Sequence, residues 1–159
     1  MAARIEFHKA SPGALDALLG LQQFVNQKSG IEASLLHLIE LRASQINGCA
    51  FCIDMHAAEA LKRGETRERL FLLSAWREAD GFSPRERAAL AWTEAVTLVA
   101  STQVPDEVYQ QVKSEFSAAE IVGLTMAVIA INSWNRMNVA LRTPAGHALA
   151  EAGGARSVA

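Results

Sequence analysis

Two S-x-x-E sequences, Ser83 to Glu86 and Ser117 to Glu120, constrain the fold of this chain more than any other feature. In such a capping box, the serine hydroxyl and the glutamate carboxylate satisfy backbone N–H groups at the start of a helix. The second box precedes a segment that is apolar on nearly every helical face from Ile121 to Ile131, which indicates burial in a bundle or a subunit interface. Strand patterns of alternating Val, Ile, Thr and Tyr are missing. The sequence therefore predicts an all-α fold.

Breaker residues between the periodic segments predict where the helices begin and end. Asn47-Gly48 separates two of them, and Lys62-Arg63-Gly64 is a C-terminal signal in which cationic residues precede a glycine. We predict helices over residues 12–27, 31–46, 49–63, 67–78, 84–100, from 105 onward, and 117–141. The tail after Thr143 is rich in small residues and is expected to fray. We see no repeat or linker, and predict a single domain over residues 1–159, a bundle of about six to eight helices.

Composition excludes several classes of protein. The chain has 159 residues, of which 50% are hydrophobic and 20% charged, with a formal net charge of −2. No basic run suggests a nucleic-acid partner. The N-terminus lacks the pattern of a signal peptide, and the longest apolar stretch is too short to span a bilayer. We expect a cytoplasmic protein without nucleic-acid or membrane partners.

The two cysteines of the chain, Cys49 and Cys52, are separated by two residues. A secreted disulfide scaffold would carry more cysteines, spread along the chain. A bridge between these two closes a very small loop, so the chain-entropy argument gives it little global stabilisation. The pairing favours redox chemistry over structural cross-linking.

The spacing of this pair to His56 is the strongest functional signal in the sequence. If Asn47-Gly48 forms the turn, both cysteines lie in the first turn of the next helix, where free N–H groups and the helix dipole stabilise a thiolate. Residues 49, 52 and 56 share one helix face. The imidazole of His56 is therefore expected one turn from Cys52, close enough to exchange a proton with it.

Other roles for the cysteines are possible from the pattern alone. The thiols could be small buried hydrophobes. They could bind zinc with His56 and one carboxylate, although structural zinc sites usually take ligands from two separated knuckles. A thioredoxin fold would require a βαβ pattern, which the sequence does not contain.

The run Ser44-Gln45-Ile46-Asn47-Gly48-Cys49-Ala50-Phe51-Cys52, together with His56, resembles the AhpD-like alkylhydroperoxidase group of the carboxymuconolactone decarboxylase family. The redox core of this resemblance covers residues 35–64, and blocks at 75–78, 82–94 and 131–136 resemble one branch of the group. The resemblance implies an all-α subunit of a symmetric homo-oligomer, a trimer or hexamer. It also implies that Cys52 meets the peroxide, that Cys49 resolves the oxidised product, and that His56 belongs to a proton relay.

The chain departs from this family pattern at the end of the relay. The best-known members carry a Glu twelve residues before the first cysteine, where this chain has His37, and a His between the cysteines, where it has Phe51. Glu40, one turn after His37, is a candidate replacement carboxylate unless it faces solvent. His37 joins the relay or lies at a subunit contact.

Five other positions receive structural interpretations. Glu94 is expected to be solvated or salt-bridged rather than a buried relay partner, and Arg42 lowers a thiol pKa only if it does not extend to water. Trp134 and the asparagines at 132 and 135 are interpreted as packing and buried hydrogen bonding.

The function predicted from the sequence is a thiol-dependent peroxidase. It would reduce hydrogen peroxide or organic hydroperoxides with electrons from a dithiol donor, using Cys52, Cys49 and His56 with Glu40 or His37, and without a metal or other cofactor. Two alternatives stay open. One is a redox-sensing or interaction protein without turnover, and the other is the decarboxylase activity that names the wider family, which needs no cysteine pair.

Overall fold

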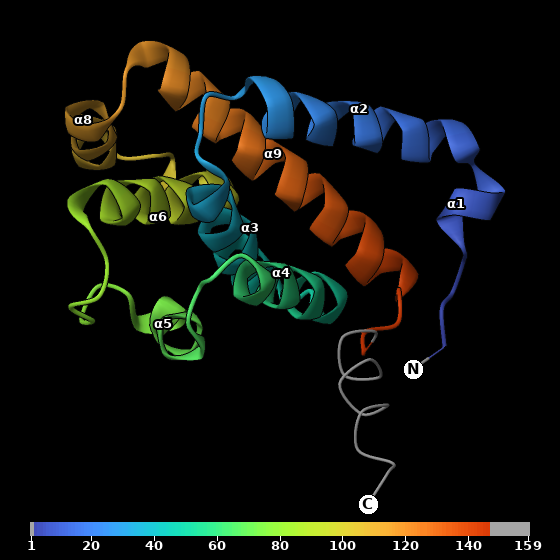
Figure 1. The fold of residues 1–159 in the computed structure, drawn as a ribbon. Helices are drawn as coiled ribbons and strands as arrows, with labels where there is room; N and C mark the ends of the chain where they lie inside the picture. Colours follow the sequence, from blue (N-terminus) through green and yellow to red (C-terminus); the bar gives the residue numbers. More distant parts are fainter. Residues whose placement is uncertain (1, 147–159) are drawn as a thin grey trace, which may run out of the picture.

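The computed structural model describes residues 2–146, and within them every regular element is a helix (Figure 1). This confirms the all-α prediction. Each predicted helix has a counterpart, and two four-residue helices, α1 and α7, were not expected. The elements are α1 (Phe7–Ala10), α2 (Pro12–Lys28), α3 (Ala33–Asn47), α4 (Ala50–Lys62), α5 (Arg67–Leu72), the 3-10 turn η1 (Leu73–Ala75), α6 (Pro84–Thr97), α7 (Val99–Thr102), α8 (Asp106–Glu115) and α9 (Ala118–Leu141).

Helix α3 occupies the centre of the bundle. It packs against α4, α6 and α9, while α2 packs along α9 and α8 packs on α6 (Figure 1). The larger apolar cluster joins α2, α3, α6, α8 and α9, and a second cluster joins α3, α4, η1 and α6. The two helices that the α3–α4 turn connects are therefore both anchored in apolar clusters.

Helix α2 is seated closely on α9. A Cβ atom on Gly123 of α9 would collide with the carbonyl oxygen of Ser29, at the end of α2. Glycine at this position allows the two backbones to approach, as small residues do where elements cross closely. This approach matters for the site because α2 contributes Gln22 to it.

Both predicted capping boxes form. Ser83 Oγ accepts from the N–H of Glu86 at 3.2 Å, and the Glu86 carboxylate accepts from the N–H of Ser83 at 2.7 Å. Ser117 and Glu120 make the same exchange at 3.3 and 2.8 Å. The sequence signals for the starts of α6 and α9 are confirmed because capping is a local interaction.

The prediction of one helix over residues 67–78 is wrong, since α5 ends at Leu72 and continues only as η1. The reason is a tertiary contact. The Arg87 guanidinium donates to the carbonyl oxygens of Trp76, at 3.0 Å, and Arg77, at 3.2 Å, and it also binds the Ala79 carbonyl. These carbonyls would otherwise be free to accept from a continuing helix.

The helix predicted over residues 84–100 also ends early, at Thr97, and a separate short helix α7 follows. Thr102 Oγ1 donates to the carbonyl oxygen of Ala95 at 2.7 Å, folding the chain back onto the end of α6. The chain then passes through left-handed backbone at Gln103 and Val104, which the sequence gives no reason to expect.

Helix α9 is only partly buried within the chain. Its inner face is enclosed, but Val122, Ile129 and Val139 are 61%, 43% and 48% exposed. The sequence predicted that this helix is buried in a bundle or in a subunit interface. The bundle buries its inner face, and a subunit interface over the exposed face stays a prediction.

In the described part of the chain, no helix alone is long and apolar enough to cross a membrane. Helices α8 and α9 meet the length and composition of a span only when taken together, and they are bent by 118° at their junction. The predicted fraying tail after Thr143 falls largely outside the described residues.

Candidate active site

A tight turn at Asn47-Gly48 places the cysteine pair at the start of α4. Helix α3 ends at Asn47, Gly48 adopts a left-handed φ of 65°, and the N–H of Cys49 donates back to the Ser44 carbonyl oxygen at 3.0 Å. Cys49 is then the N-cap of α4, and its Sγ accepts from the N–H of Cys52 at 3.4 Å. The predicted placement of both cysteines in the first turn is confirmed.

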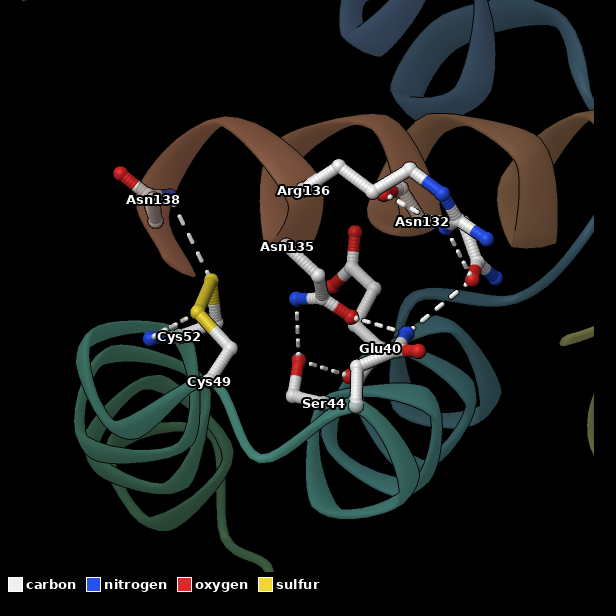
Figure 2. The surroundings of a disulfide bond; sticks show 9 residues. Glu40, Ser44, Cys49, Cys52, Asn132, Asn135, Arg136 and Asn138 are labelled. Carbon is white, nitrogen blue, oxygen red and sulfur yellow. Dashed lines mark hydrogen bonds between the residues drawn. A yellow bond between two sulfur atoms is a disulfide. The ribbon is translucent and has the colours of Figure 1, made fainter. Parts of the chain in front are cut away.

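Buried amides anchor this turn to α9. Asn47 Nδ2 donates to the side-chain oxygens of Asn132, at 3.0 Å, and Asn135, at 2.8 Å. Asn135 Nδ2 in turn donates to Ser44 Oγ at 3.0 Å (Figure 2). The interpretation of Asn132 and Asn135 as buried hydrogen-bonding residues is confirmed, and their effect is to hold the cysteine turn rigid.

The two sulfur atoms are joined as a disulfide, with the Cα atoms 5.4 Å apart (Figure 2). Asn138 of α9 is buried and donates from Nδ2 to Cys52 Sγ at 3.4 Å. Such a donor favours a negatively charged sulfur once the disulfide is reduced. The sequence analysis missed Asn138. The signal that could have found it is the three-residue spacing of asparagines 132, 135 and 138 along one helix.

A pocket of about 830 Å³ opens in front of Cys52. Its apolar wall includes Phe51, Met55 and Trp134. Among the described residues, Cys52 lines this pocket and Cys49 does not, although both cysteines are 1% exposed and pack in one small cluster with Ala43 and Ile131. The two sulfurs therefore differ in their position relative to the pocket, which borders Cys52.

The imidazole of His56 meets a carboxylate in this pocket. His56 Nδ1 lies 3.2 Å from Glu40 Oε2, and both side chains are more than nine-tenths buried, at 8% and 6% exposure. The contact is an ion pair without the alignment of a hydrogen bond. Gln22 Nε2 donates to the other carboxylate oxygen, Oε1, at 2.9 Å. The alternative of a solvent-facing Glu40 is therefore wrong.

The charges of this pair support each other. Burial acts to raise the pKa of Glu40, but polar contacts with His37 and His56 outweigh it and lower the pKa to about 2. Burial acts to lower the pKa of His56, but contacts with Glu40 and Glu59 raise it from 6.5 to about 9. At neutral pH the pair is an imidazolium and a carboxylate.

Two more titratable groups surround His56. His37 Nδ1 lies 3.7 Å from Glu40 Oε2, beyond hydrogen-bond distance, and Glu59 Oε2 lies 3.6 Å from His56 Nδ1. His37, Glu40, His56 and Glu59 all line the pocket. Glu59 and Gln22 were missed by the sequence analysis; Glu59 was detectable because it stands three residues after His56 on one helix face.

Arg42 and Glu94 lie in a separate interaction. Arg42 Nε donates to Glu94 Oε1 at 2.7 Å and Nη1 donates to Gln45 at 3.2 Å. Glu94 also accepts from Trp76 Nε1 at 2.9 Å and pairs with Arg77. The expectation of a salt-bridged Glu94 is confirmed, and the Arg42 guanidinium is paired with that glutamate.

Comparison with known proteins places the chain. Residues 12–95 match the model of the Carboxymuconolactone decarboxylase family, which is more than half of the chain. The chain belongs to this family. Within it, the described fold is AhpD-like, as the sequence resemblance predicted.

Several proteins similar to this family member align with most of its length. Uncharacterized protein YdfG of Bacillus subtilis is 40% identical over 141 residues, covering 89% of this chain and 95% of YdfG. The structure of ATU0492 from Agrobacterium tumefaciens, a protein of unknown function named as a candidate antioxidant defence protein AhpD, is 45% identical with a TM-score of 0.87, covering 91% of this chain and 98% of ATU0492. The debrominase Bmp8 shares the fold at 20% identity and a TM-score of 0.80, covering 90% of this chain and 76% of Bmp8.

Proposed function

We propose that this protein is a thiol-dependent peroxidase that cycles between a Cys49–Cys52 dithiol and disulfide. The observation that carries the proposal is the inequality of the two sulfurs. Cys52 lines a pocket that also contains the His56–Glu40 ion pair, and its disulfide partner Cys49 is not among the described residues that line it. A nucleophile facing substrate, a proton donor and a second thiol in bonding distance are the parts that peroxide reduction needs.

In the first step, the Cys52 thiolate attacks the outer oxygen of a hydroperoxide, and the O–O bond breaks. Cys52 becomes a sulfenic acid, the peroxide is reduced by two electrons, and the departing alkoxide or hydroxide takes a proton to leave as alcohol or water. We assign this proton to the His56 imidazolium. Its pKa of about 9 keeps it protonated at neutral pH, yet it is far more acidic than the alcohol formed.

In the second step, the Cys49 thiol displaces the sulfenic oxygen from Cys52, forming the disulfide and releasing water. Two electrons from an external dithiol then restore both thiols. We expect the donor to attack Cys52 Sγ, because this sulfur faces the pocket. Cys49 would leave as a thiolate at the N-terminus of α4, where the N–H of Cys52 already points at its sulfur.

A stoichiometric experiment tests this function. The reduced protein is mixed with one equivalent of hydrogen peroxide or cumene hydroperoxide, free thiols are counted, and turnover is followed with excess dithiol. We expect the loss of both thiols, repeated turnover with dithiol, and abolition of turnover in Cys52→Ser. In Cys49→Ser, Cys52 should instead accumulate as a sulfenic acid that a dimedone probe traps.

Other outcomes would reject the proposal. If both thiols stay free after peroxide, the central claim fails. If the disulfide forms once but no dithiol supports turnover, the redox-sensing alternative replaces it. Release of CO₂ from a carboxymuconolactone by the Cys52→Ser variant would support the decarboxylase alternative, which needs no thiol.

We also propose a cytoplasmic homo-oligomer, a trimer or hexamer. Exposed apolar side chains on α5 and α9 support an interface, above all Phe71, which is 79% exposed. Sedimentation of the purified protein tests this, and Phe71→Glu should shift the assembly toward smaller species.

A further inference from the structure

His37, whose side chain is 11% exposed, lines the pocket, and the peroxidase cycle leaves it without a role. Neither of its ring nitrogens reaches solvent or has a hydrogen-bond partner. An imidazole offers two hydrogen-bonding positions, and a buried nitrogen without a partner loses its hydrogen bond to water and gains none in return. His56 Nδ1 is also without an aligned hydrogen bond, on a side chain that is 8% exposed. Nitrogens that lack an aligned hydrogen bond on two neighbouring histidines point to a ligand that binds both.

The arrangement of the surrounding residues has a repeating pattern. Helix α3 carries His37-Leu-Ile-Glu40 and helix α4 carries His56-Ala-Ala-Glu59, so that each helix presents a His and a Glu three residues apart. Side chains at this spacing lie on one helix face. Because α3 and α4 pack against each other, the two H-x-x-E pairs meet in the pocket.

The donor atoms are close enough to share one ion. One ring nitrogen each from His37 and His56 and one carboxylate oxygen of Glu59 all lie within 4.8 Å of one another. Glu40 Oε2 lies 3.2 Å from His56 Nδ1 and 3.7 Å from His37 Nδ1. Ligands around a tetrahedral ion with bonds of about 2.0–2.2 Å are separated by roughly 3.5 Å, so that a small closure suffices. Glu59, with 48% of its side chain exposed, has the freedom to supply it.

We propose that His37, His56, Glu59 and Glu40 form a binding site for a divalent first-row transition-metal ion of the zinc class. Two imidazoles with carboxylates suit zinc and its neighbours in the series, whereas calcium and magnesium prefer sites made of oxygen alone. The site lies beside the cysteines but does not use them, which separates it from the zinc site with thiol ligands considered from the sequence. It also departs from the sequence expectation of a metal-free pocket.

Metal binding at this site has a consequence that rests on the proposed function. A metal that takes a ring nitrogen of His56 removes the proton donor that the peroxide step uses. Zinc would therefore inhibit peroxide turnover without touching either sulfur, and the pocket would act as a metal-sensitive control on the enzyme.

The binding experiment uses the oxidised, tag-free protein, because its disulfide prevents the thiols from acting as ligands. We expect calorimetric titration with Zn²⁺ to give one ion per chain. His37→Gln and Glu59→Gln should each weaken binding by about tenfold or more. The matched control is the double variant His8→Gln/His147→Gln, which removes the other two histidines of the chain and should bind as the wild type does. Glu59 is half exposed, so its variant reports on binding even if His37→Gln proves poorly folded.

Absence of Zn²⁺ binding to the oxidised protein would overturn the proposal, as would unchanged binding in Glu59→Gln. Co²⁺ provides a second readout, since ligation by imidazole and carboxylate in a tetrahedral site gives strong visible absorption that a surface-bound ion lacks. Turnover is measured separately. Zinc binding in a protein that shows no peroxidase activity would retain the metal site and reject the proposed function, whereas binding that leaves active enzyme uninhibited would reject the control of activity.

Discussion

Glu40 and Glu94 are two glutamates on neighbouring helices, and the difference between their partners separates a reactive site from a structural one. Glu94 is bound by Arg42, Trp76 and Arg77, donors that keep their charge or polarity at every ordinary pH. Glu40 is bound by Gln22 and faces His37 and His56, and its carboxylate helps to raise the pKa of His56 to about 9. Burial alone therefore does not identify a functional carboxylate; titratable partners beside a pocket do.

The largest expected difference between the two sites is in catalysis. Glu40→Gln removes the charge that keeps His56 protonated, and we expect peroxide turnover to fall by about 100-fold, in the range that general acid catalysis contributes. Glu94→Gln is the matched control and should leave turnover nearly unchanged. Steady-state rates with a dithiol donor measure both. If turnover falls equally in Glu40→Gln and Glu94→Gln, the distinction between a reactive and a structural glutamate is wrong.

The Glu94 site should contribute measurably to the stability of the fold. Glu94→Gln leaves Arg42, 16% exposed, without its carboxylate, and we expect the free energy of unfolding to fall by about 2 kcal/mol, typical of a lost charge-assisted hydrogen bond. Urea unfolding of the oxidised protein measures this change. A Glu94→Gln variant as stable as the wild type would show that the Arg42 and Arg77 contacts contribute nothing measurable.

The two sites should also differ in the pH dependence of stability. The pKa of His56 is raised to about 9 in the folded protein, so its contribution is full below pH 6.5, its ordinary value, and is lost as pH rises through 9. The pKa of Glu40 is lowered to about 2, so its contribution is full above pH 4.5 and is lost as pH falls toward 2. The pair should therefore stabilise the fold most between pH 4.5 and 6.5.

This pH dependence can be followed by urea unfolding of the disulfide form, in which the thiols do not titrate. Glu40→Gln should reduce the alkaline loss of stability, since His56 then lacks its main anionic partner. Glu94→Gln should preserve it, because arginine partners do not titrate there. An alkaline loss that persists fully in Glu40→Gln would contradict the assignment.

The smallest expected effect concerns Asn138. Asn138→Leu keeps the bulk of the side chain but removes the N–H that donates to Cys52 Sγ. Losing one such donor should slow the reaction of Cys52 with peroxide by about threefold at neutral pH. Stopped-flow measurement of thiol loss tests this. Asn138→Gln retains an amide N–H and is the matched control. An unchanged rate in Asn138→Leu would show that Asn138 acts through packing and not as a hydrogen-bond donor.

Local interactions explain which features could be predicted from the sequence. The capping boxes of α6 and α9, the Asn47-Gly48 turn and the first-turn position of both cysteines depend on residues a few positions apart, and each is confirmed. The predicted ends of the helices over 67–78 and 84–100 are wrong because Arg87 and Thr102 donate to carbonyl groups 7 to 11 residues earlier in the chain, a separation that helical spacing does not connect.

The same distinction applies to the candidate site. The sequence by itself determined the cysteine pair, its family and the helix face shared with His56, because these follow from spacing along one helix. The tertiary structure alone decided that Glu40 lies beside His56, that Asn138 donates to Cys52, and that Cys52 rather than Cys49 lines the pocket. These relations join α2, α3, α4 and α9, and the distance between side chains on different helices is set by how the helices pack, which no local pattern specifies.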